Sequence, residues 1–420
     1  MRYIVKGGKK LTGTLQVSGN KNSVFPCVAA ALLTDEEVIL ENIAKLKDTE
    51  VLIDILKKLG VRIKTSGSTL TIKAENIDHF TLPEKLMVKL RGSLVLAGSM
   101  LARKGKVIFW HPGGDIIGRR SIDTHIEGFK TLGVTVKRDN LKYSFVLPNN
   151  GKEGIVNIFL KETSVTATEN LILASVLGKK EVILRNCAKE PHVQDLCRML
   201  SQMGAKLEGI GEDTLKIQGV STLSGTRFKI SSDYIELGTY AVAAAITGGR
   251  IKLEGIVNAD LDPICSALKD FGLNTEKGDG FMTFWADKLK SPPRLTTNIW
   301  PGFPTDLMSV AIVLATQSKG VILCHDWMYE SRMFFVDKLI SMGAQIILAD
   351  PHRVLISGPS KLKGRNLDTP DIRAGMAMLL ASLAAKGRSV IGQAELIERG
   401  YEDAVGKLRT LGAEIEKFEV

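Results

Sequence analysis

The sequence predicts an α/β protein built from six copies of one structural repeat, with three copies in each of two domains. Three observations support this: a recurring apolar-Gly-apolar signature, a helix of small residues in every repeat, and a length of 420 residues. The signature glycines recur at intervals of about 70 residues, so six repeats fill the chain. They are Gly60, Gly133, Gly204, Gly272, Gly343 and Gly412. Six repeats exceed one core of ordinary size, so we expect a domain break between residues 229 and 233.

The first element of each repeat is a helix rich in Ala, Gly and Ser. Because small residues are often fully buried and let backbones approach closely, we expect this helix to be the inner one. These helices include residues 29–33, 94–101, 171–177, 240–246, 309–314 and 377–383. A turn and a strand follow each of them, over residues 36–40, 105–109, 180–184, 249–253, 319–323 and 388–392.

The second helix has apolar residues at a 3.6-residue period, as at 48–60 and 193–204, and carries charges on its outer face. The signature glycine ends this helix in a left-handed conformation. Two more strands, such as 61–64 and 69–73, complete the repeat. Each repeat therefore contains two helices and about four strands, and we expect mixed sheets.

The composition is that of a folded protein with acidic partners. Hydrophobic residues make up 44% of the chain and charged residues 24%, which excludes a largely disordered protein. The net charge of +10 favours a small anion, a nucleic acid or a membrane surface as partner. Because the Lys and Arg residues are dispersed, a basic tail is excluded.

The chain shows no sign of export, membrane insertion or metal binding. Its first residues lack a signal peptide, and the longest apolar run, 376–385, is too short to cross a bilayer, so we expect a cytoplasmic protein. The cysteines lack metal-ligand spacing, so we expect reduced, mostly buried thiols and no structural metal. They are Cys27, Cys187, Cys197, Cys265 and Cys324.

Polar residues recur where each small-residue helix begins. Backbone N–H groups are unpaired at such a position and the helix dipole is positive. A single Lys or Arg would more often be a solvated surface residue, but recurrence at one structural position favours a site. If the helices run in parallel, two such faces form a cleft for phosphate and carboxylate groups. The residues are Lys21 with Asn22, Arg91, Ser164 with Thr166 and Thr168, Glu236, Asp306 and Arg373.

A Gly-rich segment at 111–123 carries paired arginines between a strand and a helix. The glycines alone indicate a turn. With Asp115 and Arg120 inside it, the segment is also compatible with a mobile lid that carries an acid and an anion clamp.

At these positions the chain resembles the enolpyruvyl transferase family, and within it the branch that acts on a UDP-sugar. The resemblance covers essentially the whole chain. It depends on seven motifs: SGNKN at 18–22, LRGS at 90–93, PGGDIIGRR at 112–120, FPTD at 303–306, ESR at 330–332, DIRAG at 371–375 and ERGYE at 398–402.

The resemblance implies a fold of two inside-out αβ-barrel (αβ prism) domains, each of three βαβαββ repeats. One domain comprises 21–230 and carries the lid loop 111–121. The other comprises 1–20 with 231–420, and the active site lies in the cleft between them.

The resemblance also implies an activity. The enolpyruvyl group of phosphoenolpyruvate is transferred to the 3-hydroxyl of UDP-N-acetylglucosamine with release of phosphate, at the first committed step of peptidoglycan synthesis. No metal or organic cofactor is needed. We expect a monomer that binds these small molecules and neither nucleic acid nor membrane.

Residue roles follow by motif match. Asn22 would bind the sugar, and Asp371 would support the charge network. Asp306 would take the proton of the sugar hydroxyl, although an aspartate at this place also suits a helix N-cap. The residues implied to hold phosphoenolpyruvate and complete a basic cleft are Lys21, Arg91, Arg120, Arg332, Arg373 and Arg399.

Asp115 departs from the family pattern, because most members place a cysteine here as general acid and some carry Asp. A carboxyl group beside Arg119 and Arg120 can still deliver a proton, but it forms no stable thioether. We therefore expect an active enzyme that resists fosfomycin, the epoxide that alkylates the cysteine.

The nucleotide side departs further. Ser121 replaces a usual Pro, Thr166 a usual Gly and Met328 a smaller residue. Glu162 stands where a Lys often faces the diphosphate, with Lys161 beside it as a substitute. The remaining residues implied in substrate binding are Ser121, Ile122, Asp123, Thr124, His125, Lys161, Ser164, Val165 and Met328.

Three alternatives stay open. The acceptor could be shikimate 3-phosphate or a nucleotide instead of the UDP-sugar. RNA binding or RNA end processing suits the positive charge, but only 6% of the residues are aromatic and the tryptophans are scattered. An inactive homologue with a regulatory role is the third alternative, against which the joint presence of the charged motif residues argues.

Overall fold

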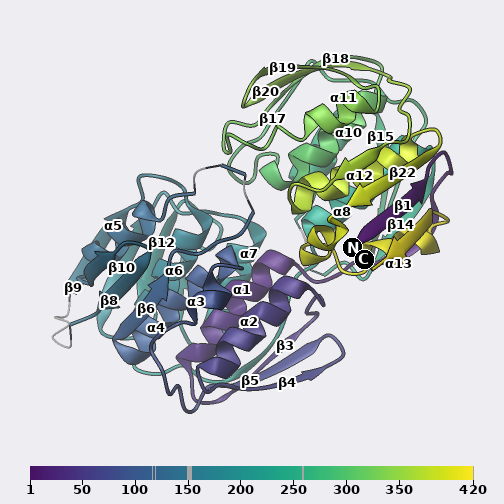
Figure 1. Ribbon diagram of the computed structural model, residues 1–420. Coiled ribbons are helices and arrows are strands. Elements are labelled where there is room, and N and C mark those ends of the chain that lie inside the picture. The colour runs from purple at the N-terminus through teal and green to yellow at the C-terminus, as the bar shows by residue number, and fades with distance from the viewer. Residues whose placement is uncertain (116, 119, 149–153, 258–259, 420) are drawn as a thin grey trace. The chain divides into compact units, whose positions relative to one another are not determined.

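The computed structural model describes residues 1–115, 117–118, 120–148, 154–257 and 260–419 (Figure 1). The chain forms two compact units. Unit 1 consists of Met1–Ser18, a short segment that begins at Asp115, and the chain from Ser232 onward. Unit 2 consists of Gly19–Gly114 and Arg120–Ser231.

Unit 2 contains three sheets within its described residues, with strand orders β13-β3-β5-β4, β11-β12-β10-β9 and β6-β8-β7. In the first two, a parallel strand pair is extended by an antiparallel hairpin. In the third, Thr81 forms a parallel bridge to Ile108 where a fourth strand would lie. The strands are β3 Glu37–Glu41, β4 Arg62–Ser66, β5 Thr69–Lys73, β6 Lys106–Trp110, β7 Thr135–Asp139, β8 Lys142–Val146, β9 Gly154–Phe159, β10 Lys180–Arg185, β11 Lys206–Glu208, β12 Thr214–Gln218 and β13 Thr226–Lys229.

Unit 1 repeats this plan, with strand orders β15-β16-β14-β2, β17-β18-β20-β19 and β21-β22-β1-β23. In the last sheet β1, at the purple end of the chain, lies between the yellow strands β22 and β23 (Figure 1). The strands are β1 Arg2–Lys6, β2 Thr12–Gln16, β14 Arg250–Glu254, β15 Leu273–Gly278, β16 Phe281–Ala286, β17 Arg294–Thr296, β18 Gly320–His325, β19 Gln345–Asp350, β20 Arg353–Gly358, β21 Asn366–Asp368, β22 Arg388–Gly392 and β23 Glu414–Phe418. The predicted α/β class with mixed sheets is confirmed.

The small-residue helices are the buried ones, as predicted. In each unit the three of them contact one another, and nearly all their residues are buried. They are α1 Lys21–Ala30, α4 Leu96–Lys104 and α6 Val165–Ser175 in unit 2, and α8 Tyr234–Thr247, α10 Met308–Gln317 and α12 Ile372–Ala384 in unit 1. In unit 2, short 3-10 turns adjoin two of these helices, η1 Ala31–Leu33 after α1 and η2 Arg91–Val95 before α4.

The second helix of each repeat exposes most of its charges, with Asp48 of α2 and Asp195 of α7 as buried exceptions. The predicted glycine ends are confirmed, because all six signature glycines have φ between +89° and +103°. These helices are α2 Lys47–Lys58, α5 Asp123–Thr131, α7 Pro191–Gln202, α9 Asp262–Asp270, α11 Val336–Ser341 and α13 Ala404–Thr410. The remaining short elements are α3 Glu84–Met87, η3 Thr305–Leu307 and η4 Ala394–Arg399.

The first strand of one repeat is exchanged between the units. β2 precedes α1 of unit 2 along the chain but pairs with β14 in unit 1, and β13 precedes α8 of unit 1 but pairs with β3 in unit 2. The chain therefore passes between the units at Ser18 and again at Ser231.

At each of these two crossing points, a buried carboxylate accepts a hydrogen bond from the crossing residue. Glu236 accepts a hydrogen bond from the backbone N–H of Ser18 at 2.8 Å and pairs with Lys407. Asp195 accepts from the hydroxyls of Ser231 and Ser23 at 2.5 and 2.7 Å. Glu236, one of the recurring polar residues, therefore has a structural contact within unit 1.

Candidate active site

Asp306 lies between two buried arginines of unit 1. Its Oδ1 accepts a hydrogen bond from Nη2 of Arg332 at 3.1 Å. Its Oδ2 accepts from Nη2 and Nε of Arg373, at 2.8 and 3.1 Å. Asp306 belongs to η3, which leads into α10, and Arg373 is the second residue of α12. Helix starts that are far apart in sequence thus bring the acid and its partners together, and the two bonds from Arg373 fix the orientation of the carboxylate.

Both arginines remain charged although they are buried. Burial disfavours the charge of Arg332, but the nearby carboxylates of Asp306, Asp371 and Asp326 outweigh it and raise the pKa of Arg332. Burial is likewise outweighed at Arg373, chiefly by Asp306, and the pKa of Arg373 is raised.

Within the described residues, two donors of this cluster have no hydrogen-bond partner, Nε of Arg332 and Nη1 of Arg373. The side chain of Arg332 is 2% exposed. Buried donors are nearly always satisfied. The unpaired Nε beside Asp306 is therefore a position where an anionic ligand atom would be stabilised.

Helix capping is performed by Asp371 and not by Asp306. Oδ1 of Asp371 accepts from the backbone N–H groups of Arg373 and Ala374, both at 2.9 Å, which makes it the N-cap of α12. The carboxylate oxygens of Asp306 bind the two arginines, and no side chain caps η3. The N-cap alternative for Asp306 is therefore wrong. Burial raises the pKa of Asp371, although the charge of Arg332 opposes this.

A second aspartate, Asp326, organises the same region and was not predicted. It is fully buried and accepts hydrogen bonds from the hydroxyls of Thr297 and Thr305, the latter directly before Asp306. It also accepts from the backbone N–H of Met328 at 3.0 Å, so it fixes that predicted residue too. The sequence signal, Asp326 after a strand, was too weak to single out.

Asp115 lies against Arg399 in unit 1, at 3.0 Å between Oδ1 and Nη1. The backbone also holds this segment, because the carbonyl of Ile117 accepts from the N–H of Ser331 at 3.0 Å. The predicted lid thus brings its acid to a motif arginine. Arg119, predicted beside this acid, lies outside the described residues.

In unit 2, Lys21 begins α1 and pairs with Asp48 of α2 at 2.8 Å, both side chains being buried. Asn22 follows it, and its N–H is bound by the N-cap Asn20. Burial of an ion pair keeps the ammonium group at a fixed place at the start of the helix.

Arg91 and Arg120 approach each other around Gly114. Gly114 has φ +118°, and a Cβ there would lie 2.9 Å from Cβ of Arg91 and 3.7 Å from Nη1 of Arg120, so only glycine fits the turn. Nη2 of Arg91 donates to the carbonyl of Ser121 at 3.1 Å. The structure therefore brings together Gly114 of the predicted lid segment, two predicted arginines and the start of 121–125.

The segment 121–125 leads into α5. The hydroxyl of Ser121 donates to the carboxylate of Asp123 and accepts from the backbone N–H of Asp123. Ile122 is 3% exposed and belongs to the hydrophobic core, so its side chain is not available to a ligand. His125 is buried and contacts Thr166 and Asn170.

The residues expected at the diphosphate point in different directions. Lys161 pairs with Glu127 at 2.9 Å and is 75% exposed. Glu162 lies 3.5 Å from the hydroxyl of Thr124, next to 121–125. Ser164 caps α6, whose first residue is Val165. The pairing of Lys161 with Glu127 does not support the prediction that Lys161 substitutes for the usual lysine.

With this geometry in view, the sequence profile of the EPSP synthase (3-phosphoshikimate 1-carboxyvinyltransferase) family matches residues 5–408. The chain belongs to this family. It is similar to proteins named UDP-N-acetylglucosamine 1-carboxyvinyltransferase from Borreliella burgdorferi, at 46% identity over 99% of both chains, and from Treponema denticola, at 44% over 99% of both. The relative of that name from Bradyrhizobium diazoefficiens is 45% identical over 99% of this chain and 98% of its own.

Solved structures share the family fold. The enolpyruvyl transferase NikO from Streptomyces tendae matches with a TM-score of 0.88 at 23% identity, over 99% of this chain and 98% of that one. An EPSP synthase from Acinetobacter baumannii matches with a TM-score of 0.75 at 15% identity, over 99% and 100%. At these identities the likeness shows the architecture alone.

Two more residues that contact predicted site residues were not predicted from the sequence. Tyr401 lies inside ERGYE and its ring centroid is 5.3 Å from the guanidinium carbon of Arg373. Asp48 pairs with Lys21. The first could have been found from its motif, whereas the second depends on how α1 and α2 pack.

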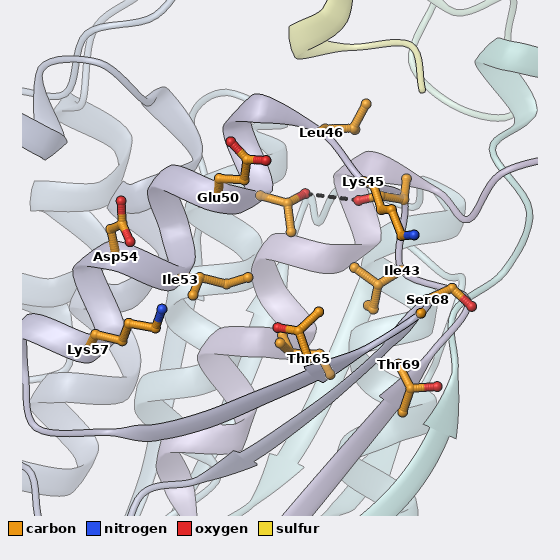
Figure 2. A pocket seen from close by; sticks show the side chains of 14 residues that line it. Ile43, Lys45, Leu46, Glu50, Ile53, Asp54, Lys57, Thr65, Ser68 and Thr69 are labelled. Carbon is orange, nitrogen blue, oxygen red and sulfur yellow. Dashed lines mark hydrogen bonds between the residues drawn. The ribbon is translucent and has the colours of Figure 1, made fainter. Parts of the chain in front are cut away.

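A cavity of about 480 Å³ lies in unit 2 between α2 and the β4-β5 hairpin (Figure 2). Its lining includes Ile43, Ile53 and Thr65, and it contains none of the predicted site residues. Among the residues that the structure describes, no group of three His, Cys, Asp or Glu side chains is placed to hold a metal ion. No described helix is both long and apolar enough to cross a membrane.

Proposed function

We propose that this chain transfers the enolpyruvyl group of phosphoenolpyruvate to the 3-hydroxyl of UDP-N-acetylglucosamine and releases phosphate. The observation that carries the proposal is identity of 44 to 46% over 99% of the chain with relatives named for this reaction. The protein then acts in peptidoglycan synthesis, as a cytoplasmic monomer that needs no cofactor.

The reaction needs an acid, a base and cations. The oxygen of the sugar hydroxyl attacks C2 of phosphoenolpyruvate and loses its proton. At the same step C3 of phosphoenolpyruvate gains a proton. Loss of a C3 proton and cleavage of the C2–O bond to phosphate then restore the double bond. A positioned acid and base contribute about 10²- to 10⁴-fold each to such a step.

We assign the base to Asp306 and the acid to Asp115. The guanidinium groups of Arg332 and Arg373 orient Asp306 and counter the negative charge around it. Arg399, at 3.0 Å from Asp115, can hold the departing phosphate near the acid.

The other predicted residues receive binding roles. Lys21, Arg91 and Arg120 hold phosphoenolpyruvate, and Asn22 binds the sugar. The segment 121–125 with Lys161, Ser164, Val165 and Met328 surrounds the nucleotide. These roles require that the candidate residues of unit 1 and those of unit 2 face one cleft. In this proposal each unit forms an inside-out αβ prism, and 111–121 is the lid.

Asp115 also determines the response to fosfomycin. A carboxylate yields no stable thioether, so activity should persist under fosfomycin. Asp115→Cys should introduce time-dependent inactivation, with one adduct at this position by mass spectrometry. Inactivation of the natural protein with an adduct on Asp115 would contradict this.

The assay of function measures phosphate release from phosphoenolpyruvate with UDP-N-acetylglucosamine, shikimate 3-phosphate or UMP as acceptor. We expect release with the UDP-sugar alone. Shikimate 3-phosphate is the second candidate, because the family profile is described by that activity. Release with shikimate 3-phosphate instead of the UDP-sugar would reject the proposal.

A further inference from the structure

Asn170 joins three elements that carry predicted site residues. It is fully buried in α6, the helix that begins with Ser164 and Val165. Its Oδ1 accepts a hydrogen bond from the backbone N–H of Gly98 at 2.7 Å, and its Nδ2 donates to the carbonyl of Leu94 at 3.0 Å. Leu94 belongs to η2, the turn that begins with Arg91.

These two backbone contacts fix which way the amide of Asn170 faces. An N–H can bind only the oxygen of the amide, and a carbonyl only its nitrogen. The helices approach closely here, because a Cβ on Gly98 would lie 2.2 Å from the backbone oxygen of Asn170. The amide therefore cannot be exchanged end for end without losing both bonds.

The fixed amide determines the tautomer of His125. Nδ2 of Asn170 has two hydrogens, of which one is used by Leu94, and it lies 3.2 Å from Nδ1 of His125. Nδ1 must then present its lone pair, so a neutral imidazole carries its proton on Nε2. Burial, aided by the charge of Arg91, lowers the pKa of His125 to about 3, which keeps the ring neutral.

The Nε2 proton in turn orients Thr166. Nε2 of His125 lies 3.0 Å from Oγ1 of Thr166, so the ring donates and the hydroxyl accepts. The hydroxyl proton of Thr166 then points elsewhere. In the described parts of the chain no acceptor for it is found, and Thr166 is only half-buried, in the first turn of α6.

We propose that Asn170 is a positioning residue for the nucleotide-sugar half of the active site. It holds His125 as the Nε2–H tautomer, so that the hydroxyl of Thr166 is presented as a donor to an acceptor oxygen of the bound nucleotide sugar. The proposal rests on the function proposed above for its ligand, whereas the tautomer itself depends on the chain alone.

The first test needs no variant. Long-range ¹H–¹⁵N correlation spectra of the uniformly labelled protein report the tautomer of each of the six histidines, and a His125→Gln sample assigns the signal. We expect a protonated Nε2 and an unprotonated Nδ1 at neutral pH. A protonated Nδ1 at His125 would overturn the proposal, whether or not the protein transfers enolpyruvyl groups.

The second test reverses the donor. Asn170→Asp replaces the NH₂ that faces Nδ1 with an acceptor, so the proton of the neutral His125 ring should move from Nε2 to Nδ1. Thr166 would then donate to Nε2 and no longer to the ligand. We expect KM for UDP-N-acetylglucosamine to rise about 5- to 10-fold, the effect of one hydrogen bond, with KM for phosphoenolpyruvate and kcat within about 2-fold.

Thr166 provides the check if Asn170→Asp fails to fold. Thr166→Val should raise KM for the nucleotide sugar by the same factor, and Thr166→Ser should restore it. The matched control is Asn186→Asp, because Asn186 also donates to a buried carbonyl in unit 2, that of Leu160, without contacting a histidine. Unchanged KM for the nucleotide sugar in Thr166→Val, or an equal rise in both KM values in Asn170→Asp, would show a purely structural role.

Discussion

The candidate residues of the two units differ in how their charges are balanced. In unit 1 aspartates and arginines occur together, and Asp306 and Asp115 each contact guanidinium groups. In unit 2 the candidates include four cations and one carboxylate, Asp123. Lys21 and Lys161 pair with carboxylates outside the candidate set, whereas Arg91 and Arg120 lie close together around Gly114. A balanced cluster suits proton transfer, whereas an excess of cations suits anion binding. The comparison suggests that chemistry and binding are divided between the units.

The same helix start carries both kinds of residue. Lys21 begins α1 and Arg91 begins the turn before α4, while Asp306 precedes α10 and Arg373 lies in the first turn of α12. One repeat therefore provides the same kind of position six times, and the side chain placed there decides its chemistry.

The largest effect should follow from Asp306→Asn. This change keeps the shape but removes the proposed base and the carboxylate charge that both buried arginines contact. We expect kcat to fall about 10²- to 10⁴-fold, with a smaller change in KM, in a phosphate-release assay. Asp270→Asn, at an exposed position of α9, is the control. A loss of less than about tenfold would remove Asp306 from the chemistry and weaken the division between units.

A smaller, different effect is expected from Arg91→Met in unit 2. Loss of a binding cation should raise KM for phosphoenolpyruvate about tenfold and change kcat little. The ratio of this KM in the variant to that in the wild type should decrease as salt is added, because mobile ions screen partly exposed charges. Arg62→Met, which breaks an exposed pair with Glu75, provides the comparison. If kcat falls instead of KM rising, unit 2 also takes part in the chemistry.

Asp371 tests whether its charge matters beyond its cap. Asp371→Ala removes the N-cap of α12, worth about 1 kcal/mol, and should lower Tm by about 2–4 °C. Asp371→Asn keeps the cap and should melt within about 1 °C of wild type. Both variants remove the charge near Arg332, so an equal loss of kcat in the two would assign a role to the charge, and normal kcat in Asp371→Asn would restrict Asp371 to capping.

The smallest effect concerns Glu169, a buried carboxyl group of unit 2 that forms no ion pair with any described residue. Burial, and then the charge of Glu190, raise its pKa well above the ordinary 4.5. A carboxyl group with a raised pKa contributes stability in full when the pH is below its pKa in the unfolded chain. This contribution is lost as the pH rises through its pKa in the folded protein.

Glu169→Gln imitates the protonated acid. It should melt about 2–4 °C above wild type near pH 8 and at about the same temperature near pH 4. Glu208→Gln, at an exposed site, should show no such pH dependence. A Glu169→Gln variant that is less stable at pH 8 would mean that the carboxylate has a stabilising partner, as in unit 1.

The repeat and its elements could be predicted from sequence because their signals are local. The glycine that ends each second helix needs φ > 0, and the small residues of each first helix mark burial. The exchange of β2 and β13 between units was implied by the family resemblance, which grouped 1–20 with 231–420, and not by the strands themselves, since short strands carry no signal of their partner.

The site shows the same limit. Aspartates occur at the start of both α10 and α12, yet only Asp371 caps its helix, whereas Asp306 contacts arginines. Asp306 lies in the 3-10 turn η3, a local difference that the sequence does not reveal. Asn170 was missed for a related reason. A buried polar residue in an apolar helix reveals its role only when its partners, Gly98, Leu94 and His125, are known.

The exchanged strands also set the order in which the molecule can be completed during synthesis. All segments of unit 2 have been synthesised once Ser231 is made, whereas β1 and β2 are made before them and must wait for β14, β22 and β23. The wait of β1 lasts for most of translation, because Arg2 pairs with Phe418. A waiting strand exposes an edge that can join another nascent chain. Charged residues disfavour such joining, and β1 begins with Arg2 and ends with Lys6.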